Sequence, residues 1–341
     1  MRRSGLPWQG GGESPLMRPL FEILGRWPAW EQAALRHGLA AWVADELSVA
    51  GKPVPAAITS AARAQVANGV KLKRLTLAVT DGLAAEGVIP VLLKGYGLAT
   101  RLFPGQPFAR PASDVDVLVL PEEVPPAEAA LSKLGLRLSS VPGVEDIFEE
   151  HHHRPWSGPP GLVELHFRLF SGFGGAVFDD RQIRARTTLG MLDGRQVRWL
   201  APEDEFLYLA THVANHAFLR ISWLVDLARY LDFAPRLDWA LMAERAFTSG
   251  FAVPVTAALD SLERLLEVSI PRAARAAFPT SRLRRRVDAR LFSGERIVDA
   301  RWSNAPLSSF LLRLYLVDSP GQGARYLLDG AKRYLRQRRG G

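Results

Sequence analysis

The feature that most constrains the fold of this chain is a pair of aspartates, Asp114 and Asp116, at the start of an apolar run. The segment reads Arg110-Pro111-Ala112-Ser113-Asp114-Val115-Asp116-Val117-Leu118-Val119-Leu120. Successive side chains of a β-strand alternate between its two faces, so Asp114 and Asp116 point the same way while Val115 and Val117 point into a core. The segment therefore predicts a strand that buries one face and carries two carboxylates on the other.

Two neighbouring carboxylates repel each other unless a cation lies between them, because like charges disfavour ionisation. Mg²⁺ commonly binds one or two carboxylates together with the phosphates of a substrate. The pair therefore indicates metal-dependent phosphoryl or nucleotidyl transfer. A lone Asp-x-Asp is also common in turns, but this pair leads into a strand and lies between two further polar motifs.

The first of these motifs lies upstream, where residues 88–95 predict a buried strand that ends at Gly95. Gly95 and Gly97 open a helical stretch over residues 96–103. A strand–glycine–helix junction lets backbone N–H groups approach a phosphate at the start of the helix. Lys94 adds a positive charge there, and the chain has only 6 lysines against 37 arginines.

The second motif lies downstream, where residues 161–170 predict another strand. Glu164 and His166 share one face of this strand, and Leu165 and Phe167 share the other. Glu164 is a candidate third carboxylate of a two-metal site, although a strand acid paired with an arginine gives the same pattern. His166 could contact a phosphate or hold Glu164 in place.

The order of these motifs resembles the nucleotidyltransferase superfamily, whose fold is that of polymerase-β-type enzymes. The closest resemblance is to a bacterial branch described as uncharacterised nucleotidyltransferases. The motifs are Lys94-Gly95, Arg110-x-x-x-Asp114-x-Asp116 and Val163-Glu164-Leu165-His166, with further similarity at Ala34–Leu39, Pro202–Asp204, His212, His216 and Trp223–Asp226. The resemblance covers residues 20–235. The superfamily usually has Gly-Gly or Gly-Ser about a dozen residues before Asp-x-Asp, whereas here Lys94-Gly95 replaces the glycine pair and Gly95 lies 19 residues before Asp114.

The resemblance implies an α+β fold, with a nucleotidyltransferase-type mixed sheet, helices before it and a helical domain after it. It implies a transferase that moves NMP from an NTP such as ATP to a hydroxyl or phosphate acceptor and releases pyrophosphate, with Mg²⁺ or Mn²⁺. The catalytic and metal-binding residues would be Asp114, Asp116 and Glu164. The nucleotide-binding residues would be Lys94, Gly95, Arg110 and His166.

Two other classes of function remain open. One is a nucleotide-sensing module that keeps the fold without catalysis, and the other is a toxin-like enzyme that modifies RNA or protein. Members of the branch also occur beside genes for peptide natural products, which suggests a tailoring role. The sequence does not define the acceptor, the particular NTP or the oligomeric state.

The chain divides into four predicted regions. These are a Gly- and Pro-rich extension over 1–16 that is expected to be disordered, helices over 17–87, the nucleotidyltransferase core over 88–200, and a helical domain with a basic tail over 201–341. The predicted strands are 89–94, 115–120, 136–140, 146–152, 161–169 and 196–200, with a helix at 122–135. Residues 171–180 form a candidate mobile substrate loop, and Pro202 with the acids after it predicts a helix start.

Composition excludes several classes of protein. The chain has no cysteine, which rules out disulfides and thiolate metal sites. It has no run of about 18 apolar residues, so no membrane span is expected. The N-terminus lacks the apolar segment of a secretory signal, and a bacterial cytoplasmic protein is the simplest interpretation. The net charge of +8 suits phosphate-bearing partners.

Several other residues have two interpretations. Arg110 could bind a phosphate oxygen or be one surface arginine among many. His212 and His216 have the i, i+4 spacing of a metal site, but the favoured interpretation is buried, hydrogen-bonded histidines that dock the helical domain on the sheet. Asp226 would lie about 21 Å from His212 on a continuous helix, and could approach it only if the chain turns back near Ser222.

The remaining charged clusters are interpreted as structural or solvated. They are the histidine run 151–153, the arginine-rich segment 272–290 and the basic tail 332–339. Arginine runs are usually solvated helix faces, and each of these segments has a single aromatic residue, Phe278 or Tyr334, rather than repeated aromatic interleaving. Nucleic-acid binding therefore stays possible but is not favoured.

Overall fold

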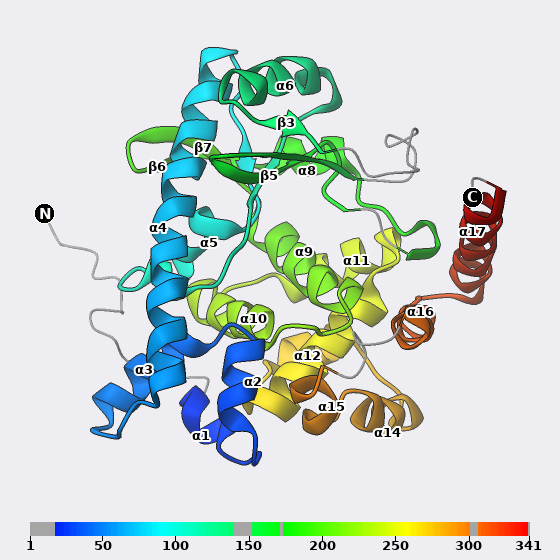
Figure 1. Cartoon of the computed structure of the whole chain (residues 1–341). Helices are drawn as coiled ribbons and strands as arrows, with labels where there is room; N and C mark the ends of the chain where they lie inside the picture. Colours follow the sequence, from blue (N-terminus) through cyan, green and yellow to red (C-terminus); the bar gives the residue numbers. More distant parts are fainter. Residues whose placement is uncertain (1–17, 140–151, 171–172, 301–305, 340–341) are drawn as a thin grey trace, which may run out of the picture.

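The computed structural model describes residues 18–139, 152–170, 173–300 and 306–339 (Figure 1). The predicted N-terminal extension over 1–16 lies outside these residues. The described chain combines one mixed β-sheet with helices on both sides, which confirms the predicted α+β class. None of the helices in the described part of the chain has both the length and the apolar character needed to cross a bilayer.

The described residues form a seven-stranded sheet with the order β3-β4-β5-β2-β1-β7-β6. The strands are β1 (Val91–Leu92), β2 (Val115–Leu118), β3 (Arg137–Leu138), β4 (His153–Gly158), β5 (Gly161–His166), β6 (Thr188–Leu192) and β7 (Arg195–Trp199). Strand β2 pairs parallel with β5, and β1 pairs parallel with β7. The other pairings are antiparallel. Strands β2 and β5, which carry Asp116 and Glu164, therefore lie side by side near the centre of the sheet.

The two faces of the central strands have different roles. Val115 and Val117 of β2 and Val163 and Leu165 of β5 are buried in a core beneath two helices, α4 (Ala56–Ala85) and α6 (Val124–Lys133). The alternate residues of the same strands, including Asp116, point to the opposite face. This confirms the alternation that the sequence predicted.

The helices before the sheet are α1 (Leu20–Leu24), α2 (Trp30–Arg36), α3 (Ala40–Val49) and the long α4. Within the core, α5 (Gly95–Leu102) follows β1, the short 3-10 helices η1 (Pro107–Ala109), η2 (Pro121–Glu123) and η3 (Phe173–Gly175) connect strands, and α8 (Asp180–Arg186) precedes β6. With its 30 residues, α4 is about 45 Å long and runs along one side of the molecule for most of its height in Figure 1.

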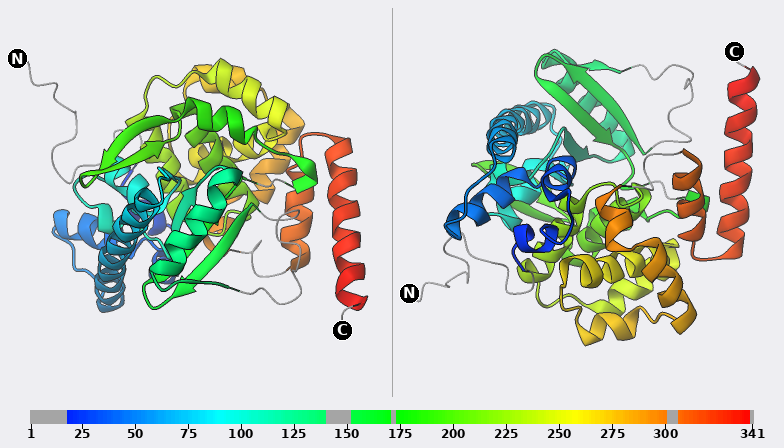
Figure 2. Two further views of the ribbon diagram at one scale, coloured as in Figure 1. Left: turned by 90° about the horizontal axis from the view of Figure 1, so that it is seen from above. Right: turned by 60° about the horizontal axis from the view of Figure 1, so that its bottom comes forward.

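The chain after the sheet is helical, as predicted. Its helices are α9 (Pro202–Asn215), α10 (Ile221–Phe233), α11 (Trp239–Ser249), α12 (Ala252–Leu266), α13 (Arg272–Ala277), α14 (Arg282–Leu291), α15 (Gly294–Val298), α16 (Pro306–Tyr315) and α17 (Pro320–Arg339). Helices α9 and α10 share one large apolar core with α1–α3 and α5. In both Figure 1 and Figure 2, α17 lies on the side of the molecule away from α4.

Several element boundaries differ from the predictions. The predicted strand 146–152 lies almost wholly outside the described residues, and β4 instead begins at His153. Strand β6 was not predicted. The candidate loop 171–180 contains η3 and the start of α8, and residues 171–172 lie outside the described part. The domain boundaries at 16, 87 and 200 stay a prediction.

Candidate active site

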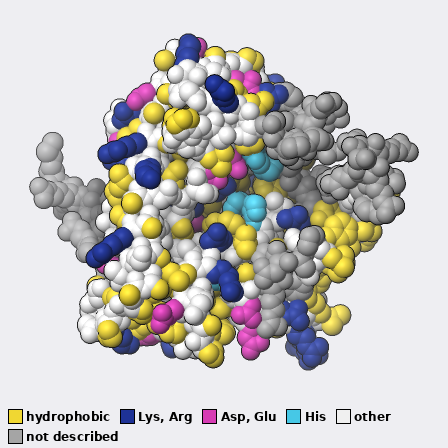
Figure 3. Space-filling model, in the orientation of Figure 1, with side chains coloured by type: hydrophobic (Ala, Val, Ile, Leu, Met, Phe, Trp, Pro, Cys, Tyr) yellow, Lys and Arg dark blue, Asp and Glu magenta, His cyan; other side chains and the backbone are white. Residues whose placement is uncertain are grey.

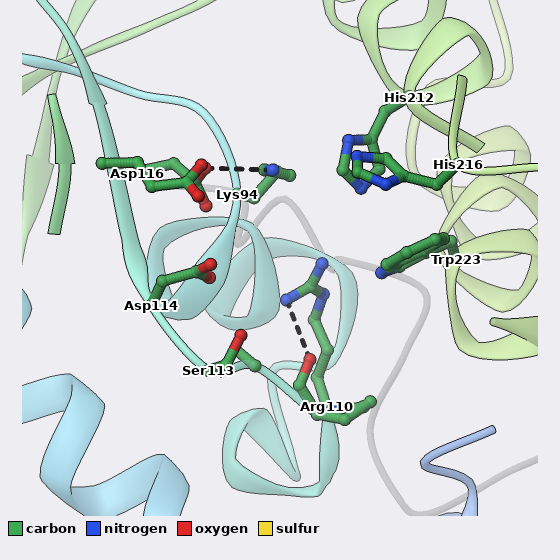
Figure 4. A pocket seen from close by; sticks show the side chains of 12 residues that line it. Lys94, Arg110, Ser113, Asp114, Asp116, His212, His216 and Trp223 are labelled. Atoms are coloured by element: carbon green, nitrogen blue, oxygen red, sulfur yellow. Dashed lines mark hydrogen bonds and ion pairs between the residues drawn. The ribbon is translucent and has the colours of Figure 1, made fainter. Parts of the chain in front are cut away.

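Three carboxylates meet on the sheet face that looks toward α9 and α10. Asp116 and Glu164 are direct partners in the parallel β2·β5 register, so their side chains leave neighbouring strands on the same face. Asp114 lies two residues before Asp116, just outside β2, and lines the same cavity (Figure 4). The register therefore brings Asp116 and Glu164 together, and Asp114 lines the same cavity without belonging to the group of ligand atoms within 4.8 Å of one another.

The cavity has a volume of about 150 Å³. It is lined by Lys94, Gly95, Arg110, Pro111, Ala112, Ser113, Asp114, Asp116, Glu164, His212, His216 and Trp223. Figure 3 shows histidine side chains near the middle of this face of the molecule, with acidic and basic side chains beside them. One wall comes from the sheet and α5, and the other comes from α9 and α10 (Figure 4).

The strand–glycine–helix junction forms as predicted. Strand β1 ends at Leu92, Lys94 is the N-cap of α5, and Gly95 is its first residue. Gly95 has a φ of +60°, a conformation that other residues adopt at a cost. No side chain caps this helix start, and Gly95 lines the cavity, so an anion would be favoured there.

Asp116 is the most firmly held of the carboxylates. Lys94 Nζ lies 3.0 Å and His166 Nε2 lies 3.2 Å from the same atom, Asp116 Oδ1. Burial alone would raise the pKa of Asp116, but the ammonium of Lys94 outweighs it and holds the pKa well below its ordinary value. Burial likewise lowers the pKa of Lys94, but the charge of Asp116 outweighs it and the pKa is raised.

Asp114 has the opposite electrostatic environment. Burial and the nearby charge of Asp116 raise the pKa of Asp114 to about 6, and Lys94 offsets this only in part. For Glu164, burial raises the pKa, but the hydrogen bond with His166 outweighs it and the net pKa is lowered. The cavity thus holds two well-stabilised carboxylates beside one that is costly to ionise without a further cation.

Arg110 is not a surface arginine. Its Nε and Nη2 donate hydrogen bonds of 2.9 and 2.8 Å to the two carboxylate oxygens of Asp226, and both side chains are almost fully buried. Its Nη1 donates a 3.4 Å hydrogen bond to the backbone carbonyl of Pro111 (Figure 4). Arg110 therefore ties the loop before Asp114 to α10, and the predicted contact with a phosphate would have to be made beside this ion pair.

The helix carrying His212 ends at Asn215, and α10 starts at Ile221. The continuous helix considered for Asp226 is therefore absent, and the chain turns back just before Ser222. His212 and His216 line the cavity, and their rings lie 4.7 and 5.2 Å from the ring of Trp223.

The favoured interpretation of these two histidines is corrected in two respects, the first being that the side chain of His216 is exposed rather than buried. His212 is buried as expected, but its Nε2 has no hydrogen-bond partner among the described residues. Burial, followed by the positive charge of Lys94, lowers the pKa of His212 well below its ordinary value. The pKa of His216 is lowered to about 4 by the protein around its ring and by Lys94, although part of its side chain is exposed. Both rings are therefore neutral at pH 7, and they face the carboxylates across the cavity (Figure 4).

Two residues of the histidine run 151–153, which the sequence suggested to be structural or solvated, lie near the site. His153 Nε2 lies 3.6 Å from Glu164 Oε1, and the ring of His152 lies 5.3 Å from the ring of His166. A turn signal, Gly158-Pro-Pro-Gly161, could have predicted the hairpin that brings them there. The arginine-rich segment 272–290 falls on α13 and α14, far along the chain from any residue lining the cavity.

The donor set suits a hard divalent cation. Ligand atoms of Asp116, Glu164 and His166 lie within 4.8 Å of one another. Lys94 and His166 both contact Oδ1 of Asp116, and no ion pair or hydrogen bond among the described residues involves its Oδ2. Carboxylate oxygens are the ligands that Mg²⁺ and Mn²⁺ prefer.

A carboxylate pair beside a central strand, a third carboxylate on the parallel neighbour and a glycine-headed helix together are typical of a nucleotidyltransferase. The chain belongs to the family described as uncharacterised nucleotidyltransferase, which it matches over residues 25–267. Comparison with curated proteins and with solved structures finds no match. The match covers the sheet and the helices from α2 to α12, and so includes every residue that lines the cavity.

Proposed function

We propose that the protein is a metal-dependent enzyme that transfers NMP from an NTP, such as ATP, to a hydroxyl or phosphate acceptor. The acceptor oxygen forms a bond to the α-phosphorus, the bond from that phosphorus to the bridging oxygen breaks, pyrophosphate leaves, and the acceptor proton passes to solvent. The observation that carries the proposal is the pairing of Asp116 with Glu164 across parallel strands, next to Asp114.

Asp114, Asp116 and Glu164 would hold Mg²⁺ or Mn²⁺ through their oxygens. A bound dication supplies charge neutralisation on the phosphates and lowers the pKa of an attacking hydroxyl. Asp116 contributes a carboxylate that stays ionised, since Lys94 and His166 hold its pKa low. The cost of ionising Asp114 falls when a cation is bound, because the cation offsets the charge of Asp116.

Lys94 and the uncapped start of α5 would contact the triphosphate. At about 150 Å³ the cavity is smaller than the roughly 300–1,000 Å³ of pockets that enclose a whole drug-sized ligand. It fits the reacting phosphate and its cation, so the rest of the NTP would extend past Ser113, which is exposed at the cavity rim. The proposed contact between Lys94 and the triphosphate is supported by the 3.0 Å Lys94–Asp116 pair, which places the ammonium beside the carboxylates.

The wall opposite the carboxylates would face the acceptor. His212 and His216 present neutral imidazoles, and Trp223 packs edge-on against His212. An acceptor hydroxyl that hydrogen-bonds to His212 Nε2 would satisfy a buried polar atom that otherwise has no partner. A peptide natural product that carries a hydroxyl is one acceptor of this class.

The test is turnover by the pure protein with α-labelled NTPs and Mg²⁺ or Mn²⁺ against fractions of cell extract. We expect label transfer and pyrophosphate release with one NTP, both lost in Glu164→Gln. Asp81→Asn is the matched control, because Asp81 pairs with Arg195 on the surface away from the cavity. Its turnover should equal that of the wild type.

Two outcomes favour the alternatives. Tight, metal-coupled NTP binding without turnover across a broad acceptor screen would indicate a sensor. Label transfer to RNA or protein fractions, with binding to those fractions that weakens steeply as the salt concentration rises, would indicate a toxin-like enzyme.

A further inference from the structure

A cluster of three histidines lies beside the carboxylates, and two of them, His152 and His153, have no role in the proposed transfer. His153 and His166 are direct partners in the antiparallel β4·β5 register, which sets their side chains next to each other on one face. His152 precedes β4 by one residue. The ring centroids are 4.5 Å apart for His152 and His153, 5.3 Å for His152 and His166, and 5.0 Å for His153 and His166.

The backbone fixes this arrangement. The carbonyl of His152 accepts hydrogen bonds of 3.1 and 3.3 Å from the N–H groups of Phe167 and Arg168, which follow β5. The ring of His152 also packs 5.6 Å from the ring of Phe170. All three imidazoles are therefore attached to paired strand ends, so little conformational freedom remains to be lost when a ligand binds.

The cluster includes ring nitrogens that the protein leaves without partners. Nδ1 of His166 and Nδ1 of His153 are buried and have no hydrogen-bond partner among the described residues. His166 itself is only 1% exposed. Since a buried polar atom without a partner costs free energy, such atoms mark a place where a ligand or ion is expected.

A carboxylate lies beside two of the three rings. The two oxygens of Glu164 lie 3.6 Å from His153 Nε2 and 3.5 Å from His166 Nε2. Asp116 adds a second negative charge beside His166. The local field therefore favours a cation at the cluster.

We propose that His152, His153 and His166 bind a first-row transition-metal dication, with the negative charge of Glu164 close by. One ligand nitrogen from each histidine lies within 4.8 Å of the others. Zn–N bonds of about 2.0–2.1 Å in a tetrahedral site place ligand nitrogens about 3.4 Å apart, so the rings need to close by about 1.4 Å at most. Imidazole ligands favour Zn²⁺ over Mg²⁺, which makes this site distinct in chemistry from the carboxylate site for Mg²⁺ or Mn²⁺.

The proposal goes beyond nucleotidyl transfer and does not depend on it. The site shares His166 with the donor set of Asp116, Glu164 and His166, but it does not use Asp114. A Zn²⁺ ion there would fix the hairpin β4–β5 and the position of Glu164. The full-length protein can therefore be tested for metal binding without a substrate.

The experiment uses protein stripped with a chelator and then dialysed into millimolar Mg²⁺. Zn²⁺ is titrated against a chromophoric chelator, and Co²⁺ is added separately as a spectroscopic probe. We expect one Zn²⁺ per chain and an intense visible Co²⁺ band of a four-coordinate site. His152→Ala and His153→Ala should each weaken Zn²⁺ binding at least tenfold and remove the band.

The controls separate this site from its neighbours. His216→Ala removes a histidine from the opposite cavity wall, and Asp114→Asn removes a carboxylate, and neither should change Zn²⁺ affinity. Melting curves of each variant check that the fold persists, and His152 and His153 are chosen because both are only partly buried. Zn²⁺ binding that survives both histidine substitutions, or that is lost in Asp114→Asn, overturns the proposal. A weak, six-coordinate Co²⁺ spectrum overturns it as well.

Discussion

Replacing either aspartate of the Asp-x-Asp pair with asparagine should abolish transfer, but the two substitutions should change stability in opposite directions. Asp114 and Asp116 are two residues apart and have almost the same chemistry in sequence. In the structure, Asp116 contacts Lys94 and His166, whereas burial and the charge of Asp116 raise the pKa of Asp114 to about 6.

The magnitude for Asp114→Asn follows from this pKa. The folded state binds a proton at Asp114 more tightly than the unfolded state, whose ordinary value is 3.8. The contribution of protonated Asp114 to the free energy of unfolding is therefore fully present below pH 3.8 and is lost as the pH rises through about 6. The difference between the two values corresponds to roughly 3 kcal/mol, and partial solvent access at the cavity reduces it to about 1–3 kcal/mol.

Asp116→Asn has the reverse effect. It leaves the ammonium of Lys94 buried without its counter-charge, which costs about 3–5 kcal/mol when one partner of a buried pair is removed. In metal-free buffer at pH 8, we expect Asp114→Asn to melt about 1–4 °C above the wild type and Asp116→Asn to melt several degrees below it. At pH 4 the gain from Asp114→Asn should disappear.

The assay is thermal unfolding between pH 4 and pH 8, with transfer activity measured on the same samples. Asp81→Asn serves as the control, because its carboxylate pairs at the surface and should leave both midpoint and activity near wild type. If the melting midpoints of Asp114→Asn and Asp116→Asn shift in the same direction at pH 8, the opposite electrostatic environments assigned to the two aspartates are refuted.

Substitutions at Lys94 and at the Arg110–Asp226 pair test the cavity walls. Lys94→Ala should weaken NTP binding and lower stability. Lys94→Arg should rescue binding only in part, because a planar guanidinium does not replace a compact ammonium. Separate titrations of Mg²⁺ and NTP test this, and tighter Mg²⁺ binding with unchanged NTP affinity would show instead that Lys94 only neutralises Asp116. Arg110→Met should lower the free energy of unfolding by about 3–5 kcal/mol, since Asp226 would stay buried and uncompensated. Adding Asp226→Leu to Arg110→Met should restore much of that loss in denaturant titrations, and an equal or greater loss would contradict the role of this pair.

The central part of the site could be predicted from sequence because its signals are local. The alternation around Asp116 fixes which residues face the core, and Gly95 marks the start of a helix after a strand. Glu164 could be placed only as a candidate, because its position opposite Asp116 depends on the parallel register of strands 48 residues apart. The family to which the chain belongs agrees with the one that the motifs suggested.

The parts that were missed depend on long-range pairing or on turn signals that were not used. Arg110 and Asp226 are 116 residues apart, and nothing local to either marks the ion pair. Strand β6 is joined to β7 by Asp193-Gly194, both with positive φ, a dipeptide typical of a tight hairpin. The histidine run 151–153 was interpreted as structural or solvated because the pairing of β4 with β5, which sets His153 beside His166 and Glu164, is not visible in the local sequence.

The central claim is that a cation bridges the protein carboxylates and the phosphates of an NTP in one site. The most direct test is a set of melting curves for the wild type and Asp116→Asn with Mg²⁺ alone, NTP alone and both together. For the wild type we expect both ligands together to raise the midpoint by more than the sum of their separate shifts, because they bind with positive coupling. The coupling should vanish in Asp116→Asn. Additive shifts in the wild type, or coupling that persists in the variant, would contradict the shared site.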